Sequence, residues 1–263
     1  MSVHIDARAF VGPKAKLGEN VSVGPFAVVE DDAVIGDGTW IGPNAVIWSA
    51  ARIGNNCKIF PAASVGGVPQ DLKYKGEPTT LEVGDNTVVR ECATLNRGTV
   101  ESGKTIVGSD CLFMAYSHVA HDCRVGNHVI MANCCALGGH VKLGDWVIIG
   151  GLTPVHQFVH VGDHVMIGGG FRVPKDIPPY ILAGQDPLMF EGLNAVGLKR
   201  RGFSQKTVEL LEKAYDILYR SNLNVSQAVK KMKEEVELIP EVQKILEFIA
   251  QSERGIIPGR RRS

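Results

Sequence analysis

Histidines gather in one part of this 263-residue chain, between Val107 and Val173. A neutral imidazole removes a proton efficiently near neutral pH, so histidines that meet in the fold predict general-base chemistry. Three imidazoles and one water also make a catalytic zinc site, which leaves a metal-dependent hydratase open. The histidines concerned are His118, His121, His140, His156, His160 and His164.

A six-residue repeat must position these side chains. Neither an α-helix nor an ordinary β-strand has this period, whereas hexapeptide β-helices do. Three hexads make one triangular coil of 18 residues, with the aliphatic side chain inward and neighbouring coils about 4.8 Å apart. The N-terminal register is Val11, Leu17, Val23, Val29, Ile35, Ile41, Ile47, Ile53, Ile59 and Val65. The later register is Val107, Phe113, Val119, Val125, Met131, Leu137, Leu143, Ile149, Val155, Val161, Ile167 and Val173.

Glycine follows many of the repeated aliphatic residues, as Gly12, Gly18 and Gly36 illustrate. We expect these glycines to permit a tight turn that a Cβ would hinder.

Because each coil has 18 residues, residues that are 18 positions apart in the sequence should lie next to each other in adjacent coils. Counting 18 residues from His121 reaches Gly139, beside His140, and counting 36 reaches Gln157, beside His156. We therefore expect these residues along one edge of three successive coils, with His118 near the same corner. Asp122 can orient the His121 ring if its carboxylate turns towards it.

Two polar segments interrupt the repeat, residues 68–82 and 96–106, and we expect both to project as loops. The prolines of PKDIPPY (174–180) end the coils, and helices are expected over Gln205–Arg220, capped by Ser204, over about Ser226–Leu238, and from Pro240 to before Gly255. The tail Gly259–Ser263 is expected to be disordered. This predicts a β-helix domain over residues 1–187 and a helical domain over 188–263.

Composition excludes several classes of protein. The 28 basic and 28 acidic residues balance, so no overall charge points to nucleic acid. There is no signal-peptide pattern and no apolar run long enough for a membrane span. The six cysteines show no CxxC pair, which favours reduced thiols and a cytoplasmic location.

Covalent catalysis has no motif here, since GxSxG is absent. Direct transfer with a histidine base and no covalent enzyme intermediate is the economical mechanism. A basic run, Lys199-Arg200-Arg201, follows the repeats and suits phosphate or carboxylate recognition.

Four stretches together resemble one family: QDLKYKGEPT (70–79), SHVAHDC (117–123), PVHQF (154–158) and NAVGLKRRGF (194–203). They are similar to the UDP-N-acetylglucosamine O-acyltransferases that begin lipid A synthesis, and hence lipopolysaccharide, in Gram-negative bacteria. The resemblance implies a left-handed parallel β-helix with a C-terminal helical domain. It also implies a homotrimer with active sites between adjacent subunits and no resident cofactor or metal.

The implied reaction moves a (3R)-3-hydroxyacyl chain from the phosphopantetheine thioester of an acidic acyl carrier protein to the 3-hydroxyl of UDP-N-acetylglucosamine. By resemblance, His121 is the general base, Asp122 its partner and Gly139 the oxyanion donor. Gly169 matches the position that limits acyl length. The matching substrate-contacting residues are Asp71, Lys73, His118, His140, His156, Gln157, Asn194, Arg200 and Arg201.

One departure is Val196, which stands where some members place a Glu and affects the expected uridine or ribose contact. Acyl length and a 3-amino sugar as acceptor stay open. The alternatives are another hexapeptide acyltransferase or acetyl-CoA-dependent acetyltransferase, a zinc-dependent carbonic-anhydrase-like hydratase, and a noncatalytic scaffold.

Overall fold

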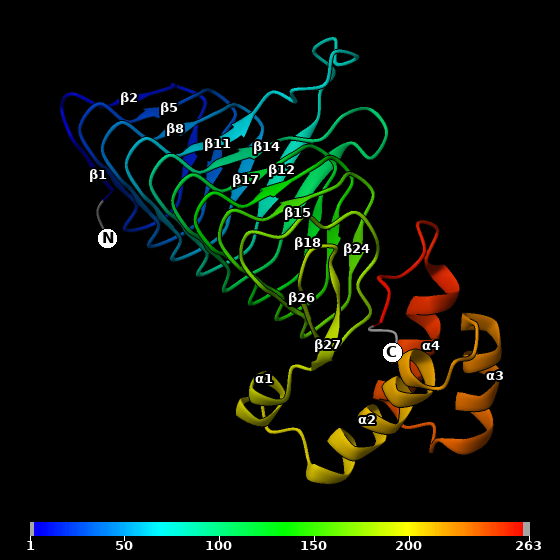
Figure 1. The fold of residues 1–263 in the computed structure, drawn as a ribbon. Coiled ribbons are helices and arrows are strands. Elements are labelled where there is room, and N and C mark those ends of the chain that lie inside the picture. The colour runs from blue at the N-terminus through cyan, green and yellow to red at the C-terminus, as the bar shows by residue number, and fades with distance from the viewer. Residues whose placement is uncertain (1–2, 260–263) are drawn as a thin grey trace.

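A computed structural model describes residues 3–259. The chain winds into a parallel β-helix of three sheets, and α-helices gather at its C-terminal end (Figure 1). The predicted architecture of β-helix followed by helices is therefore confirmed.

From β1 to β25 each sheet collects every third strand, and β26 and β27 then extend one of them; we name the sheets A, B and C. Sheet A contains β1 (His4–Ile5), β4 (Ser22–Val23), β7 (Trp40–Ile41), β10 (Lys58–Ile59), β13 (Val88–Val89), β16 (Leu112–Phe113), β19 (Ile130–Met131), β22 (Ile148–Ile149), β25 (Met166–Ile167), β26 (Ile181–Gly184) and β27 (Met189–Leu193). Sheet B contains β2 (Phe10–Val11), β5 (Val28–Val29), β8 (Val46–Ile47), β11 (Ser64–Gly67), β14 (Thr94–Asn96), β17 (His118–Val119), β20 (Ala136–Leu137) and β23 (Pro154–Val155). Sheet C contains β3 (Lys16–Leu17), β6 (Val34–Ile35), β9 (Ala51–Ile53), β12 (Thr80–Val83), β15 (Lys104–Val107), β18 (Arg124–Val125), β21 (Lys142–Leu143) and β24 (His160–Val161).

The pairing register confirms the 18-residue coil. Val119 pairs with Leu137, and Val125 pairs with Leu143, in parallel strands. The repeated aliphatic residues point inward and are almost completely buried, as Met131 at 0% exposure and Leu137 at 1% illustrate. Burying such a side chain stabilises the fold by about 1.5–3 kcal/mol, and the column of them holds the coils in register.

Close approach of the next coil, rather than the turn itself, explains the repeated glycines. None of Gly12, Gly36 and Gly138 has a positive φ. A Cβ on Gly12 would lie 2.6 Å from the backbone nitrogen of Asp31, and one on Gly138 would lie 2.7 Å from that of Gln157. The expected turn role was wrong, because the left-handed conformation falls on a later residue of the hexad.

These left-handed residues form the three edges of the prism. At the edge between sheets B and C, called the B–C edge, lie Asp122 (φ 60°), His140 (62°) and Phe158 (64°). The C–A edge, between sheets C and A, includes Trp146 and His164, with φ of 62° and 59°. The conformation recurs coil after coil, so it belongs to the fold and marks no special strain at the histidines.

Both insertions leave the helix at the B–C edge. The first loop, residues 68–79, joins β11 to β12 and projects from the solenoid (Figure 1). The second loop, residues 97–103, joins β14 to β15. Strand structure extends to Asn96 and resumes at Thr80 and Lys104, so both loops are shorter than expected.

The sheet continues beyond the proline-rich segment, where we expected the coils to stop. β26 pairs in parallel with β25, and β27 then pairs antiparallel with β26. Hydrophobic residues in these strands, such as Ile181 and Phe190, are buried and extend the core towards the helices. That expectation was wrong, whereas the proposed division between residues 187 and 188 stays a prediction.

Four helices follow within residues 3–259. α2 (Gln205–Arg220) confirms its predicted bounds, with the Ser204 side chain accepting the Thr207 N–H. α3 (Val225–Glu235) ends earlier than expected because Val236 is extended, and α4 (Pro240–Gln251) begins at its proline. The short helix α1 (Ala195–Arg200) was not expected.

Gly259 pairs with Phe190 in a β-bridge, so it is ordered against our expectation, and the rest of the predicted disordered tail lies outside the described residues. Within residues 3–259, no helix has the length and apolar character needed to cross a bilayer.

Candidate active site at the edge between sheets B and C

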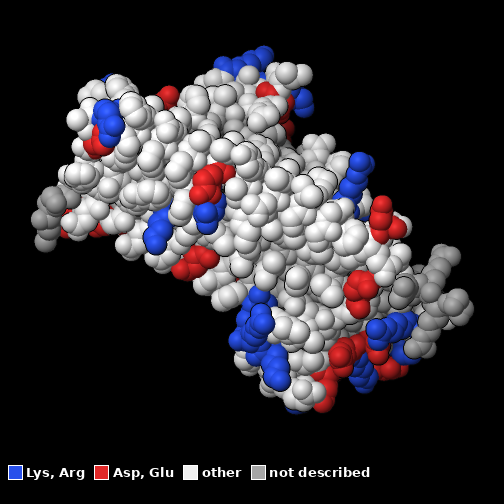
Figure 2. All heavy atoms as spheres, turned by 60° about the vertical axis from the view of Figure 1, so that its left-hand side comes forward, with Lys and Arg blue, Asp and Glu red and all other residues white. Residues whose placement is uncertain are grey.

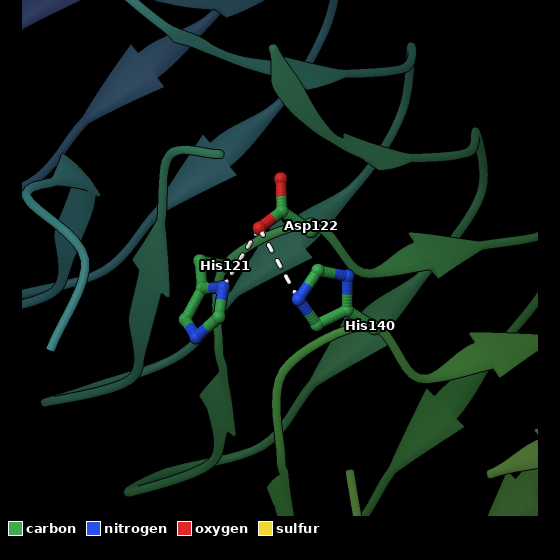
Figure 3. Close-up of side chains that lie close together, drawn as sticks. All are labelled: His121, Asp122 and His140. Carbon is green, nitrogen blue, oxygen red and sulfur yellow. Dashed lines mark hydrogen bonds and ion pairs between the residues drawn. The ribbon is translucent and has the colours of Figure 1, made fainter. Parts of the chain in front are cut away.

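His121 and Asp122 form a hydrogen-bonded pair directly after β17. The Nδ1 atom of His121 lies 2.8 Å from Oδ2 of Asp122, and the Asp122 side chain is fully buried while 16% of the His121 side chain is exposed. A carboxylate at Nδ1 favours the tautomer with its proton there, which leaves Nε2 as a free base. The dashed lines in Figure 3 show Asp122 between the two histidine rings.

The second loop saturates the Asp122 carboxylate with donors. Oδ1 accepts the Thr99 N–H at 2.9 Å and also the Ser102 hydroxyl, while Oδ2 accepts the Thr99 hydroxyl at 2.7 Å. Burial by itself raises the pKa of this carboxyl group. The hydrogen bonds from Ser102, His121 and Thr99 outweigh that effect and lower the pKa to about 2. Asp122 is therefore a fixed anion at neutral pH.

Gly139 lies under the His121 ring. A Cβ on Gly139 would lie 2.6 Å from Cε1 and 2.7 Å from Nε2 of His121, so only glycine leaves room for the imidazole. In the described part of the chain, the Gly139 N–H donates no hydrogen bond. A free amide beside a free base is the arrangement that oxyanion stabilisation requires.

His140 completes the cluster from the next coil. Its Nε2 atom lies 3.3 Å from Oε2 of Glu101 and 3.7 Å from Oδ2 of Asp122. The His140 ring meets the His121 ring edge-on, with centroids 5.2 Å apart, and stacks on Phe158. The expected neighbourhood of His121, Gly139 and His140 is thus present in the structure.

The other predicted neighbours flank this cluster. His118 Nδ1 lies 2.7 Å from the Thr94 hydroxyl, and burial, with a smaller effect of His121, lowers the His118 pKa. His156 and Gln157 are exposed in the following coil, where His156 Nδ1 donates to the Gln157 carbonyl at 2.9 Å. These side chains can meet a substrate that lies along the edge.

The first loop carries Asp71 and Lys73, joined by a hydrogen bond from the Lys73 N–H to Asp71 Oδ1 at 2.9 Å. Lys73 is exposed and Leu72 is fully exposed. Among the described residues, no hydrogen bond or ion pair links Asp71 or Lys73 to His121.

A separate cavity of about 740 Å³ holds the predicted nucleotide contacts. Asn194 caps α1 and donates to the His164 carbonyl at 2.9 Å, and the Arg201 guanidinium lies 5.0 Å from the centre of the Trp146 ring. Arg200 is exposed at the same cavity. Figure 2 shows basic side chains grouped at the lower part of this face, where Figure 1 places α1.

The two groups lie on different edges of one prism. His121 comes directly after a strand of sheet B and lies at the B–C edge. Trp146 and His164 come after strands of sheet C and lie at the C–A edge. The residues expected to share one substrate are therefore not brought together within a single copy of the chain.

Gly169 is exposed in the turn that follows β25, and a Cβ there would meet the Gly151 carbonyl oxygen at 3.1 Å. The Phe171 ring packs beside Gly168 and Gly184, where added Cβ atoms would lie 2.8 Å and 3.8 Å from it. The surface at Gly169 is consequently shaped by glycine backbone.

Metal ligation fits this donor set poorly. The ligand atoms of His121, Asp122 and His140 lie within 4.8 Å of one another. However, both Asp122 oxygens already accept hydrogen bonds, and ligation at Oδ2 would compete with the Thr99 hydroxyl and the His121 ring. The arrangement favours proton transfer over metal binding.

Several contributing residues were missed from the sequence. Thr99, Glu101 and Ser102 reach the site from the second loop, while Trp146 and Phe158 stack on histidines. The 18-residue count finds Phe158, since 140 plus 18 gives its number. No comparable count exists for the loop residues, because the loop leaves the register.

Known proteins of one family match almost the whole length of this chain. A family model described as UDP-N-acetylglucosamine O-acyltransferase, domain 2, matches residues 176–257. Another, described as bacterial transferase hexapeptide (six repeats), matches residues 32–67 and 104–139.

An acyl-[acyl-carrier-protein]–UDP-N-acetylglucosamine O-acyltransferase of Pseudomonas entomophila is 46% identical over 253 residues, covering 96% of this chain and 98% of its own length. The crystal structure of a UDP-N-acetylglucosamine acyltransferase from Bacteroides fragilis matches with a TM-score of 0.94 and 47% identity, covering 96% of this chain and 99% of that one. The corresponding enzyme structure from Acinetobacter baumannii has a TM-score of 0.93 and 42% identity over 96% of this chain and 99% of its own.

Proposed function

Because this chain belongs to the acyl-[acyl-carrier-protein]–UDP-N-acetylglucosamine O-acyltransferase family, which has the left-handed parallel β-helix fold and catalyses the first step of lipid A biosynthesis, we propose that His121 is its general base. The acceptor is the 3-hydroxyl of UDP-N-acetylglucosamine, and the donor is a (3R)-3-hydroxyacyl thioester of the acyl carrier protein. The observation that carries this proposal is the free Nε2 atom of His121 opposite its bond to Asp122.

The reaction balances without a covalent enzyme intermediate. His121 Nε2 takes the proton from the sugar hydroxyl while its oxygen attacks the thioester carbonyl carbon. The negative charge that develops on the carbonyl oxygen is stabilised by the Gly139 N–H. The carbon–sulfur bond then breaks, and the imidazolium returns its proton to the departing phosphopantetheine thiolate.

Asp122 supports both proton transfers. Its pKa of about 2 keeps it ionised at neutral pH, and its bond to Nδ1 stabilises the imidazolium that forms. His118, His140, His156 and Gln157 lie along the same edge and are positioned to contact the sugar and the acyl chain.

We infer that two copies of the chain share one substrate. Asn194, Arg200 and Arg201 line the cavity at the C–A edge, away from His121, so a neighbouring copy brings them to the B–C edge. A homotrimer with active sites between subunits satisfies this requirement. Exposed apolar side chains such as Phe26, Tyr116 and Leu152 line the remaining edge and favour such association.

The nucleotide subsite then uses the Arg201 guanidinium and the exposed Arg200 for the diphosphate, since arginine suits phosphate recognition. Val196 is 64% exposed at this cavity and offers no hydrogen bond to a ribose or uracil, so apolar contact replaces a carboxylate there. Asp71 and Lys73 approach the sugar from the first loop. We place the enzyme in the cytoplasm, consistent with its six free cysteines.

A mass-resolved acyl-transfer assay tests the function. Purified protein receives UDP-N-acetylglucosamine, or its 3-amino analogue, with a panel of 3-hydroxyacyl carrier proteins. Product that disappears in His121→Ala establishes the reaction and the base. Absence of product with every donor and both acceptors, from a folded protein, refutes it, and metal analysis of the same sample then tests the hydratase alternative.

A further inference from the structure

The second loop lies against the catalytic pair from one side. Thr99 and Ser102 together donate three hydrogen bonds to the buried Asp122 carboxylate. The Asp122 backbone N–H in turn donates to the Thr105 hydroxyl at 2.8 Å, in strand β15 directly after the loop. The loop therefore fixes the side chain of Asp122, and the strand that follows the loop fixes its backbone.

Glu101 stands between the two clamping residues and faces the other histidine. Its Oε2 atom lies 3.3 Å from His140 Nε2, closer than the 3.7 Å that separates this nitrogen from Asp122 Oδ2. Asp122 Oδ2 already accepts the Thr99 hydroxyl and the His121 Nδ1–H. A further donor at Oδ2 would compete with His121 for the same oxygen.

We propose that the second loop is the positioning element of the proton-transfer site, with Ser102 holding Asp122 and Glu101 holding His140 through Nε2. Glu101 takes the Nε2–H of His140 and thereby leaves Asp122 Oδ2 to His121. Both are positioning residues, because each acts through another side chain. The inference rests on the proposed function, since it concerns the same base.

Other charged or titratable groups surround His140 and belong in the design of the test. Asp122 and His121 face it from the preceding coil. On its other side, a hollow of about 190 Å³ is lined by His140 together with Lys142, His160, Asp176 and Glu253. Lys142 and Glu253 are exposed, whereas Asp176 is buried and accepts the His160 N–H and the Ser252 hydroxyl.

Glu101→Gln removes the charge while keeping the size of the side chain. Steady-state kinetics should show kcat lowered roughly threefold to tenfold, with KM for both substrates unchanged, because only the geometry of proton transfer is affected. The acidic limb of the pH–rate profile should move down by about half a pH unit, the effect of losing one charge several ångströms away in a wet site. Glu101→Asp should recover part of the loss.

The matched control is Glu91→Gln. Glu91 is also a partly exposed glutamate, and it pairs with Arg90 in the turn between β13 and β14. It should leave kcat and the pH profile unchanged. Equal behaviour of Glu91→Gln and Glu101→Gln overturns the role of Glu101, and so does a rise in KM with unchanged kcat.

Ser102→Ala removes one donor to Asp122, and Ser102→Thr restores it. Ser102→Ala should lower kcat roughly threefold to tenfold at constant KM and constant melting temperature, and Ser102→Thr should be near wild type. A loss of activity that Ser102→Thr fails to restore, or that follows a lowered melting temperature, overturns the role of Ser102.

A measurement without turnover separates this inference from the proposed function. Imidazole ¹⁵N NMR of histidine-labelled protein at pH 8 reports which ring nitrogen carries the proton, with His140→Gln used for assignment. His140 should carry its proton at Nε2 in the wild type and mix tautomers in Glu101→Gln, whereas Glu91→Gln should match the wild type. An unchanged His140 spectrum in Glu101→Gln refutes the inference, even if the wild type transfers acyl chains normally.

Discussion

The His121 imidazole lies directly over Gly139, which belongs to the next coil of the β-helix. A single added carbon at residue 139 would come within 2.7 Å of Nε2, the nitrogen that we propose as the base. This closeness would let the proposed base and the proposed oxyanion donor act on one carbonyl group, because the fold places them on successive coils, about 4.8 Å apart.

Gly139→Ala tests that relationship. The new methyl group displaces the His121 ring, and we expect kcat to fall at least 100-fold while the protein stays folded, as measured by acyl transfer and circular dichroism. Gly151→Ala is the control, because its added carbon meets only the Asn133 carbonyl, at 3.2 Å. Equal activity of Gly139→Ala and Gly151→Ala would show that the ring position is unimportant.

His121→Ala removes the proposed base. We expect kcat to fall by about 10²–10⁴, the usual contribution of a general base, with little change in the binding of UDP-N-acetylglucosamine measured by calorimetry. His4→Ala serves as the control, because His4 is exposed in β1 at the N-terminal end of the β-helix. Retention of more than a tenth of the activity in His121→Ala would require a different base.

Asp122→Asn tests whether the Asp122 carboxylate fixes the tautomer of His121 and stabilises its protonated form. An amide at this position no longer stabilises an imidazolium, so we expect kcat to fall by roughly 10–10³-fold, short of the loss in His121→Ala. The reduced rate should rise with pH over a range shifted to lower pH than in the wild type, because protonated His121 loses its anionic partner. A pH–rate profile identical to that of the wild type would contradict the assigned partnership.

Gly169→Met tests acyl length. The surface at residue 169 includes glycine backbone, and a Met side chain would project from the position that, by resemblance to the family, limits acyl length. We expect the preferred donor to become shorter by several carbons in competition assays with mixed acyl carrier proteins. Unchanged selectivity in a folded Gly169→Met variant would place the end of the groove elsewhere.

His164 makes stability depend on pH. Burial, with a smaller effect of Arg201, lowers the His164 pKa to about 4. The unfolded chain takes up this proton below about pH 6.5 and the folded chain does not, so stability is full above that pH and declines as pH falls towards 4. Urea unfolding should show roughly 1–2 kcal/mol of this decline, allowing for partial exposure. His164→Phe, which keeps the stacking, should show a shallower pH dependence.

The repeat made most of the β-helix predictable. Aliphatic residues at every sixth position give the coil length, and the coil length gives the neighbourhood of His121, Gly139 and His140 without any structural information. α2 was equally predictable, because Ser204 caps a clearly amphipathic segment.

Other parts follow from packing that no period reveals. β26 and β27 extend sheet A after the prolines because side chains such as Ile181 and Phe190 become buried at the open end of the core. Glu101 and Ser102 belong to a loop outside the register, so only folded coordinates show which carboxylate or imidazole they meet. The repeated glycines were correctly located but wrongly explained, since their neighbours are 18 or more residues away.

The coil register also allows only discrete separations, one coil apart, between residues on the same edge of the β-helix. Residues on one edge can be moved apart only in whole steps of one coil, because adding a single residue would turn every following aliphatic side chain off the axis. Adding 18 residues between His140 and Trp146, the first residue of the cavity lining, would instead shift the nucleotide cavity by about 4.8 Å along the helix while keeping each edge aligned. The distance along the helix axis between His121 and the nucleotide cavity can therefore change only in steps of one coil. A longer substrate would be accommodated by adding a whole coil between them.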